Sequence, residues 1–476
     1  MQLIFYDTKK KRKCPFTPLQ EGLVKIYTCG PTVYAPAHIG NFRTYIFEDL
    51  LRRTLKFLGY DVYQVMNLTD VDDKTIRAAN EQNVTLNEVT DSIIDEFFKD
   101  LDLLRIERAE VYPRATDHIP EMIELVQILL DKGYAYEMDG SIYFSISKFP
   151  EYGALSGMKL EQLERGVRVN ADEYDKENFR DFALWKAWDP NDGHVYWEAP
   201  FGKGRPGWHI ECSAMSMKYL GEEFDIHTGG VDNIFPHHEN EIAQSVCATG
   251  TGFAKWWLHS AHLNLAGEKM SKSLGNIYTI SDMQKKGYSM RALRYALLSV
   301  HYRQRLLFSD EMMNASCAAL DRLDTLWFAA THSNGEGEAR EEVSQEIINS
   351  RNNFAAGLSD DLNISSAMSA LFDFVSSIHR INAKEDLRES EGKAILEFWG
   401  EVDSVLGILI PWEQDIPDRV IEMVNERVEA RKVRDFTTAD KIRNELEVMG
   451  FCIEDSREGT IIVWDQGRKL IKNDKN

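Results

Sequence analysis

The sequence predicts an α/β protein: a Rossmann-type parallel sheet with an α+β insertion, then an α-helical bundle and a small C-terminal α+β domain. Residues 24–28 alternate as a strand does, and residues 42–58 carry apolar side chains at helical spacing, with a Gly/Pro-rich loop between them. A second strand follows at 61–67, and strand–helix–strand at this spacing is typical of a parallel sheet. Beyond residue 312 the apolar pattern is almost wholly helical, which predicts the bundle.

Composition sets broad limits on function. With 476 residues, 43% of them hydrophobic and 28% charged, the chain reads as a soluble protein of several domains. It lacks the roughly 18-residue apolar run of a membrane span, and the basic run 9–13 precedes no secretory signal. Six scattered cysteines favour a reducing cytoplasm and metal or catalytic roles. The net charge of −22 leaves a nucleic-acid partner open, because a local basic groove can coexist with acidic surface.

Pattern changes along the chain predict its further elements and six segments. We expect helices at 86–106 and 119–132, short strands within 133–206 such as 142–144, a strand at 224–227, and a helix that opens at Pro236. After Pro411 and Pro417 we expect a helix to 433, a second to 449 with Thr437 or Thr438 as N-cap, and a hairpin through 461–464. The segments are 1–113 and 207–259 (the two halves of the sheet domain), 114–206 (the connective insertion), 260–311, 312–410 (the bundle) and 411–476.

A phosphate site is predicted where the first strand feeds the first helix. Cys29 ends the strand, and His38-Ile39-Gly40-Asn41 opens the helix. Ligands of open α/β sheets bind at such strand ends, and a helix N-terminus favours phosphate. His38 and Asn41 are three residues apart and could face one anion, with Gly40 between them. The alternative is a coincidental turn.

A second basic motif lies at 268–276. Lys269 and Lys272 are three residues apart beside Gly267 and Gly275, which suits a mobile loop that closes on phosphates. A positioned ammonium group stabilises the charge that develops when pyrophosphate is displaced. The alternative is a solvated surface loop.

Two further motifs predict a metal site. Cys212 ends Trp-His-Ile-Glu-Cys, and His237 and Glu241 are spaced i, i+4, so they share one helical face. Together with Cys29 they supply two thiolates, an imidazole and a carboxylate, which is a plausible zinc set. The alternative is a buried structural cysteine and an unrelated surface pair.

A nucleotide contact is predicted where the strand 224–227 ends. Paired glycines, the second of them Gly230, allow close approach of adenosine, and Asp232 can accept from ribose hydroxyls. His227 and His238 are interpreted as structural.

His-Ile-Gly-Asn followed by Lys-Met-Ser-Lys-Ser resembles the signature pair of class I aminoacyl-tRNA synthetases. Cys29, Gly-Trp-His-Ile-Glu-Cys-Ser and Phe-Pro-His-His-Glu-Asn-Glu resemble the cysteinyl branch of that class, across essentially the whole chain. The resemblance implies that ATP with Mg²⁺ converts L-cysteine to its adenylate, and that cysteine then passes to the 3′-terminal adenosine of the tRNA for cysteine. His38, Asn41, Lys269 and Lys272 would act on the phosphates. The family tetrad usually ends in His, whereas Asn41 offers a neutral donor without positive charge.

The resemblance also implies one zinc ion, held by Cys29, Cys212, His237 and Glu241, that binds the substrate thiolate. Zinc prefers a soft thiolate to a hydroxyl, so discrimination against serine could reach about 10⁴-fold without editing. Thr69 and Trp208 resemble residues that line the cysteine pocket; for Trp208 the alternative is core packing.

Residues 411–476 resemble the family's anticodon-binding domain, residues 260–311 its signature-loop and stem-contact region, and the bundle a part that packs along tRNA. Arg431 and Phe436 could offer a cation and a stacking face, and Asp440 and Asp455 could accept from base edges. The alternative is a helical pair with a solvated charged face.

We expect a cytoplasmic monomer. Two rival functions remain: a ligase that joins cysteine to an amino-sugar, whose branch lacks the C-terminal domain, and a non-catalytic zinc-stabilised nucleotide- or RNA-binding relative.

Overall fold

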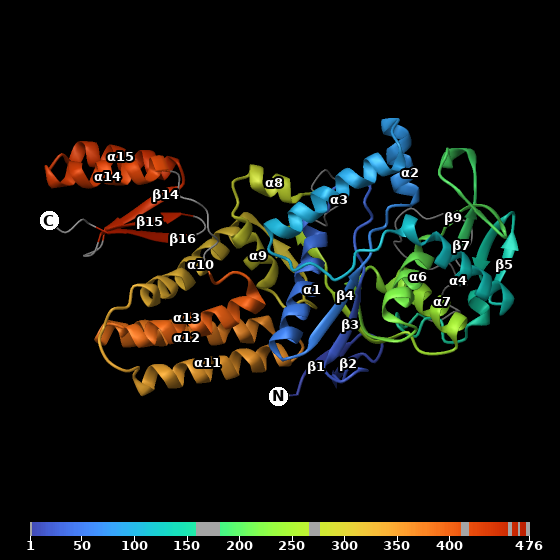
Figure 1. The fold of residues 1–476 in the computed structure, drawn as a ribbon, viewed down its shortest axis with the longest axis horizontal. Coiled ribbons are helices and arrows are strands. Elements are labelled where there is room, and N and C mark those ends of the chain that lie inside the picture. The colour runs from blue at the N-terminus through green and yellow to red at the C-terminus, as the bar shows by residue number, and fades with distance from the viewer. Residues whose placement is uncertain are drawn as a thin grey trace. The chain divides into compact units, whose positions relative to one another are not determined.

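The computed structural model describes residues 2–158, 181–265, 277–410, 418–455, 459–464 and 467–472 (Figure 1). The chain forms two compact units. The first unit comprises Met1–Asp282, Val300–Leu307 and Gly357–Asn363, and the second comprises Met283–Ser299, Phe308–Ala356 and Ile364–Asn476. Within the described part of the chain, no helix is both long and apolar enough to cross a bilayer.

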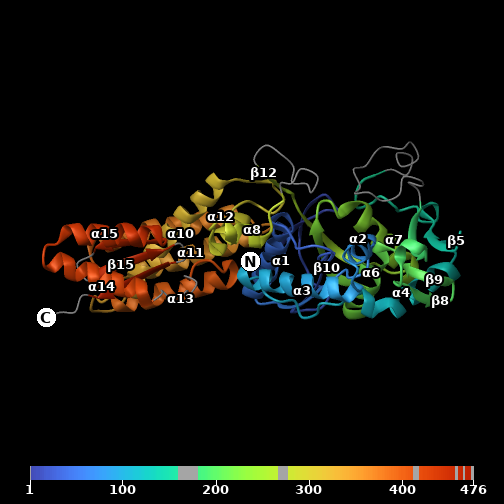
Figure 2. The ribbon, with the colours of Figure 1, turned by 90° about the horizontal axis from the view of Figure 1, so that it is seen from above.

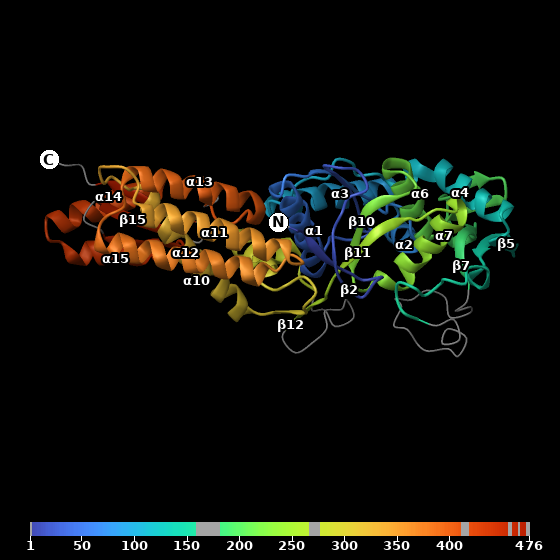
Figure 3. The same ribbon diagram turned by 90° about the horizontal axis from the view of Figure 1, so that it is seen from below.

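A four-stranded parallel sheet forms the centre of the first unit, as predicted. Its order is β11 (Ala254–Ser260), β10 (Phe224–Gly230), β3 (Leu23–Thr28), β4 (Asp61–Met66). From β3 the chain passes through α1 (Ile39–Phe57) to β4, and from β10 it passes through α7 (Glu239–Thr249) to β11, in the opposite direction along the sheet. The strand order therefore reverses between β3 and β10, which is where open α/β sheets bind ligands. Figure 3 shows β10 and β11 beside α1, which contacts both strands.

The predicted strand–loop–helix around this point is confirmed. Val24 and Ile26 are buried in β3, on the period-2 pattern of the sequence. Helix α1 ends at the cap residue Leu58, and Gly59 follows with a φ of +90°, a conformation that favours glycine. The predicted second strand is β4, and the predicted helices are α3 (Leu86–Leu103) and α4 (Ile119–Asp131).

The predicted insertion contains a five-stranded antiparallel sheet. Its order is β5 (Ala135–Met138), β6 (Ser141–Phe144), β7 (Phe182–Ala187), β9 (Gly202–Pro206), β8 (Trp197–Ala199). The insertion returns to the parallel sheet through α6 (Trp208–Leu220), which contacts β3 and β4. Figure 2 shows α4, α6 and the insertion strands at one end of this unit.

Helix α7 begins later than predicted. Residues 234–238 form a π-helical turn in which Phe235 has extended φ and ψ angles of −139° and 131°. The regular helix therefore starts at Glu239 rather than at Pro236. The i, i+4 relation between His237 and Glu241 survives this change, with His237 Nε2 3.0 Å from Glu241 Oε1.

The second unit is mainly helical, as predicted. Its long helices are α10 (Asp310–Thr331), α12 (Ile364–Lys384), α13 (Glu389–Leu406) and most of α11 (Glu341–Ser359). Arg291 on α9 (Met290–Leu298) is buried, donates to both carboxylate oxygens of Asp324 at 2.8 and 2.6 Å, and donates to the Ile408 carbonyl. These bonds compensate a charge that would be costly to bury alone.

The remaining elements outside the C-terminal part are β1 (Ile4–Asp7), β2 (Arg12–Pro15), α2 (Asp73–Gln82), β12 (Leu263–Leu265), α8 (Ile280–Lys285), β13 (Leu306–Phe308) and four short turns, η1 (Ala115–His118), η2 (Ile146–Lys148), η3 (Pro190–Asp192) and η4 (Ile234–His238).

The C-terminal part has its own small core. Helices α14 (Asp418–Lys432) and α15 (Phe436–Val448) precede an antiparallel sheet of β14 (Phe451–Asp455), β15 (Gly459–Trp464) and β16 (Gly467–Lys472). The predicted hairpin thus has a third strand. The predicted N-cap is wrong: Asp435 caps α15 by accepting from the Thr438 backbone N–H at 3.1 Å, which makes Thr438 the donor.

Replacing Asp100 with Asn is expected to stabilise the protein most at alkaline pH. Burial, and then the nearby Glu96, raise the pKa of Asp100 to about 7. An unfolded aspartate ionises near pH 4, so folding retains a proton and stability falls as pH rises from about 4 to 7. The Asn variant avoids this cost, and its gain should be about 1–2 kcal/mol larger at pH 8 than at pH 5.

Thermal unfolding at both pH values measures this gain. Asp95→Asn removes an exposed charge from the same helix and serves as the control. Equal shifts for the two variants at both pH values would contradict the prediction.

Candidate metal centre and phosphate crevice

The four predicted metal ligands converge on one point at the carboxyl edge of the parallel sheet. Cys29 follows β3, Cys212 lies on α6, and His237 and Glu241 lie on either side of the start of α7. One ligand atom from each lies within 4.8 Å of all the others. A tetrahedral zinc ion separates its sulfur and nitrogen ligands by about 3.3–3.8 Å. The set is compact enough for a single ion.

The chemistry of these donors also fits a cation. Glu241 Oε1 is buried and, in the described part of the chain, has no partner with hydrogen-bond geometry, although His237 Nε2 is 3.0 Å away. Two ligands of one metal ion are expected to show this arrangement, with their donor atoms close together but not directed at each other. Interaction with the Cys29 thiol lowers the pKa of Cys212 to about 6, whereas burial and then Cys212 raise the pKa of Cys29. The pair thus favours the thiolate at Cys212, which suits a thiophilic metal.

His237 is oriented by its neighbours on α6. His209 Nδ1 lies 2.9 Å from His237 Nδ1, which leaves Nε2 toward the ligand set. The Trp208 indole stacks on the His237 ring, with centroids 4.3 Å apart and an interplanar angle of 23°. Trp208, predicted to line the cysteine pocket or to pack in the core, therefore lies against a predicted metal ligand.

The two histidines predicted to be structural bond to the predicted ligands. His227 Nε2 lies 2.8 Å from Glu241 Oε2, and His238 Nε2 lies 3.2 Å from Cys29 Sγ. These two histidines with Cys29 and Glu241 also form a compact donor set. Such outer partners commonly fix the rotamers of metal ligands.

A hydrogen-bonded chain continues from this cluster to the first hairpin. His238 Nδ1 lies 2.8 Å from His259 Nε2, and His259 Nδ1 lies 2.8 Å from Thr8 Oγ1. Burial lowers the pKa of His238 well below its usual value and that of His259 to about 3. Both rings are therefore neutral, and each can donate at one nitrogen and accept at the other.

Thr69 reaches the site through the loop after β4. The Asn67 side chain accepts from the Gly30 N–H at 2.9 Å and donates to the Thr69 hydroxyl at 3.1 Å. Thr69 also lies beside Glu211. Burial raises the pKa of the Glu211 carboxyl well above its usual range, and the Thr69 hydroxyl partly offsets that increase. Trp208 and Glu211 line one cavity. Both predicted pocket residues, Thr69 and Trp208, thus lie near the Glu211 carboxyl group.

Gly30→Ala is expected to disrupt this part of the site. A Cβ at Gly30 would overlap the backbone carbonyl of Asn67, and backbone cannot yield as a side-chain tip can. We expect the variant to lose about 1–3 kcal/mol of folding stability, which is typical of an overpacked core, and to have a reduced metal content. Differential scanning calorimetry and zinc analysis measure the two effects.

Gly400→Ala is the control, because a Cβ there meets no atom within 4 Å and alanine favours a helix interior. Wild-type stability of Gly30→Ala would contradict the predicted overlap.

His38 and Asn41 cap helix α1. Asn41 N donates to His38 Nδ1 at 3.2 Å, and His38 N donates to Asn41 Oδ1 at 3.1 Å. With Nδ1 accepting, a neutral His38 carries its proton on Nε2. Gly40 lies between them in the first turn of α1.

The predicted lysines Lys269 and Lys272 lie outside the described residues. The chain is described again from Ile277, and the Tyr278 carbonyl accepts from the Ile39 N–H at 2.9 Å. The segment that follows the lysine motif is therefore hydrogen-bonded to the predicted phosphate tetrad.

The predicted adenosine contacts lie at the end of β10. Gly230 N donates to Asn233 Oδ1 at 3.0 Å, and the Asp232 side chain is 71% exposed. A Cβ at Gly229 would come within 2.9 Å of the His238 ring. Close packing against His238 therefore explains why residue 229 is glycine, and sequence reasoning missed this contact.

The predicted tRNA-contact residues are all exposed in the C-terminal domain. Asp455 accepts from Arg427 at 2.9 and 3.0 Å and pairs with Arg431. Phe436 is 59% exposed, and Asp440 is exposed one turn further along α15. Arg431 and Asp455 neutralise each other here, which the sequence pattern did not indicate.

The sequence matches two family models. The model described as the tRNA synthetases class I (C) catalytic domain matches residues 15–318, and the DALR domain matches residues 353–410. Among solved structures, methionyl-tRNA synthetase from Mycobacterium tuberculosis in complex with methionyl-adenylate has a TM-score of 0.58 at 16% identity, covering 82% of this chain and 91% of that one. A putative arginyl-tRNA synthetase from Campylobacter jejuni has a TM-score of 0.55 at 13% identity, covering 82% and 92%. The family match over residues 15–318, together with the fold, places this chain among the class I tRNA synthetases.

Curated relatives narrow this class. The cysteine–tRNA ligase of Chlamydia muridarum is 48% identical, covering 96% of this chain and 99% of the relative. The cysteine–tRNA ligase of Brachyspira hyodysenteriae is 47% identical, covering 96% and 98%. This chain belongs to the cysteine–tRNA ligase family.

Proposed function

We propose that this protein activates L-cysteine with ATP and transfers it to the 3′-terminal adenosine of the tRNA for cysteine. The observation that carries the proposal is a buried thiol, imidazole and carboxylate set at the same strand end as a capped helix N-terminus. Cys29 and His38 belong to the two ends of one loop, between β3 and α1. The proposed thiol-binding centre and phosphate-binding position thus flank one loop.

Cys29, Cys212, His237 and Glu241 would hold zinc, which when bound supplies a soft Lewis acid that prefers the cysteine thiolate to the serine hydroxyl. The partners His209, His227 and His238 would keep these ligands in their rotamers. Because binding energy then depends on the thiol itself, no separate editing site is required.

The phosphate chemistry is assigned to the helix α1 tetrad and the lysine motif. The substrate carboxylate attacks the α-phosphorus of ATP, a P–O bond forms, and the bond to pyrophosphate breaks. His38 would donate from Nε2, and Asn41 from its amide nitrogen, to α-phosphate oxygens. Lys269 and Lys272 would neutralise the departing pyrophosphate, which leaves with Mg²⁺. Gly230 and Asp232 would hold the adenosine.

The C-terminal domain supports tRNA rather than an amino-sugar as the acceptor. It has its own buried core, in which Val424, Leu446 and Ile462 are fully buried, and an acceptor that small would need no such domain. Arg431, Phe436, Asp440 and Asp455 remain our candidates for contact with the anticodon, with Arg431 released from Asp455 on binding. Action as a monomer remains a prediction.

ATP–pyrophosphate exchange on zinc-loaded protein tests the proposal. We expect exchange with cysteine, none above background with serine, and subsequent charging of the tRNA. Absence of exchange with cysteine on folded, zinc-loaded protein, with and without tRNA, would overturn the ligase assignment and favour a non-catalytic binding protein. Exchange without tRNA charging would favour the amino-sugar ligase instead.

A further inference from the structure

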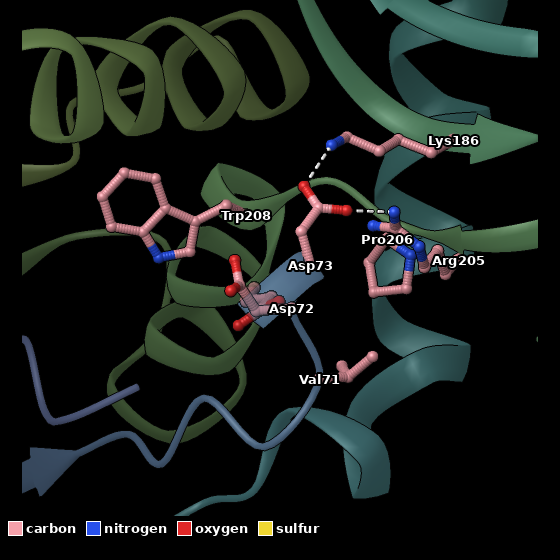
Figure 4. A pocket seen from close by; sticks show the side chains of 8 residues that line it. Val71, Asp72, Asp73, Lys186, Arg205, Pro206 and Trp208 are labelled. Carbon is pink, nitrogen blue, oxygen red and sulfur yellow. Dashed lines mark hydrogen bonds and ion pairs between the residues drawn. The ribbon is translucent and has the colours of Figure 1, made fainter. Parts of the chain in front are cut away.

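A small cavity lies beside Trp208, between the start of α2 and the insertion sheet (Figure 4). Three carboxylates line it, from Asp72, Asp73 and Glu211, against two cations, from Lys186 and Arg205. Three carboxyl groups therefore face two cations in the lining. The question is which of the three carboxylates lacks a partner.

Two of the three are engaged. Asp72 caps helix α2 by accepting from the Lys74 N–H at 2.7 Å. Asp73 pairs with Lys186 at 2.8 Å and also with Arg205, as Figure 4 shows. The acids at 72 and 73 thus have structural roles, and the two cations of the lining are already paired.

Glu211 differs from both. Its side chain is 1% exposed, and neither carboxylate oxygen has a partner with hydrogen-bond geometry among the described residues. A buried carboxylate without a partner is costly. Retaining one is reasonable if a ligand supplies the missing positive charge.

The position of Glu211 identifies that ligand group. It precedes Cys212 directly, follows Trp208 by one turn of α6, and has the Thr69 hydroxyl beside it. In cysteine the sulfur and the ammonium nitrogen are three covalent bonds apart. A group that binds the ammonium must therefore lie within a few ångströms of the ligand set that takes the thiolate.

We propose that the Glu211 carboxylate, with the Thr69 hydroxyl, binds the α-ammonium group of the amino-acid substrate. This rests on the proposed function and deepens it. The three polar groups of cysteine would then have separate partners: a zinc ion held by the four predicted ligands for the thiolate, the α-phosphorus for the carboxylate and Glu211 for the ammonium. Three-point fixation holds the carboxylate in line with the α-phosphorus.

Glu211→Gln keeps the shape of the side chain and removes its charge. We expect zinc-loaded Glu211→Gln to bind cysteine about 10–100-fold more weakly than wild type, the range of a lost hydrogen bond to a charged group. The affinity for 3-mercaptopropionate, which has the thiol and the carboxylate but no amine, should change by less than about 3-fold. Calorimetric titration gives both constants, and the KM for cysteine in exchange should rise in parallel.

Asp73→Asn is the matched control, because it removes one charge from the same cavity but from an acid that already has partners. Zinc content is measured for every variant. Equal losses for the two ligands in Glu211→Gln, or unchanged cysteine binding, would overturn the proposal.

If Glu211→Gln does not fold or retain zinc, wild type decides the outcome. The proposal requires wild type to prefer cysteine to 3-mercaptopropionate by at least about 10-fold, and equal affinities overturn it. Cysteine-selective binding without any exchange would leave the Glu211 assignment standing while the proposed activity fails.

Discussion

Cys212→Ser is expected to remove both the metal and the activation of cysteine. Serine at this position replaces a buried thiolate ligand with a neutral hydroxyl, which is not among the ligands that zinc sites use. Loss of an outer partner of a metal ligand commonly costs 10–100-fold, so loss of a ligand should lower cysteine-dependent exchange by more than about 100-fold. Zinc should fall from about one per chain to a small fraction, as measured by inductively coupled plasma spectrometry.

Cys14→Ser is the matched control. Cys14 is also buried, but it lies on β2 and its sulfur faces the Arg12 carbonyl at 3.7 Å, which a serine hydroxyl can also use. This variant should keep its zinc and its exchange. Wild-type exchange by zinc-free Cys212→Ser would show that recognition of cysteine does not depend on the metal.

The parts of the fold that sequence predicts are those with local periodicity. β3 and α1 show their periods of 2 and 3.6 in the sequence, and the spacing of strand, helix and next strand indicates a parallel sheet. The four metal ligands could also be predicted from local features of the sequence. His237 and Glu241 are local neighbours, and Cys29 ends a strand at the edge where α/β sheets bind ligands.

The rest depends on tertiary placement, which no local pattern encodes. The bond from His238 to Cys29 joins residues 209 apart in sequence, and the bond from His259 to Thr8 joins residues 251 apart. His209 and Glu211 were visible inside the Trp-His-Ile-Glu-Cys motif, which was the available signal. Their roles follow only once α6 is placed against α7 and the loop after β4.

Replacing His38 is expected to separate the structural role of this residue from its chemical role. His38→Asn keeps an N-cap that can accept from the Asn41 N–H, since asparagine is among the best N-caps. His38→Ala removes the cap as well and should cost about 1 kcal/mol of stability. Both variants lose the Nε2 donor, and loss of one such donor lowers a rate by about 10²–10³-fold.

Exchange rate and thermal stability, measured on wild type and both variants, therefore give two independent readouts. We expect exchange to fall similarly in both variants and stability to fall only in His38→Ala. Thr85→Ala removes a comparable capping box from α3 and should lower stability without affecting exchange. Near-normal exchange in His38→Asn would show that His38 serves the helix alone, and the phosphate charge would then fall to Asn41 and the lysine motif.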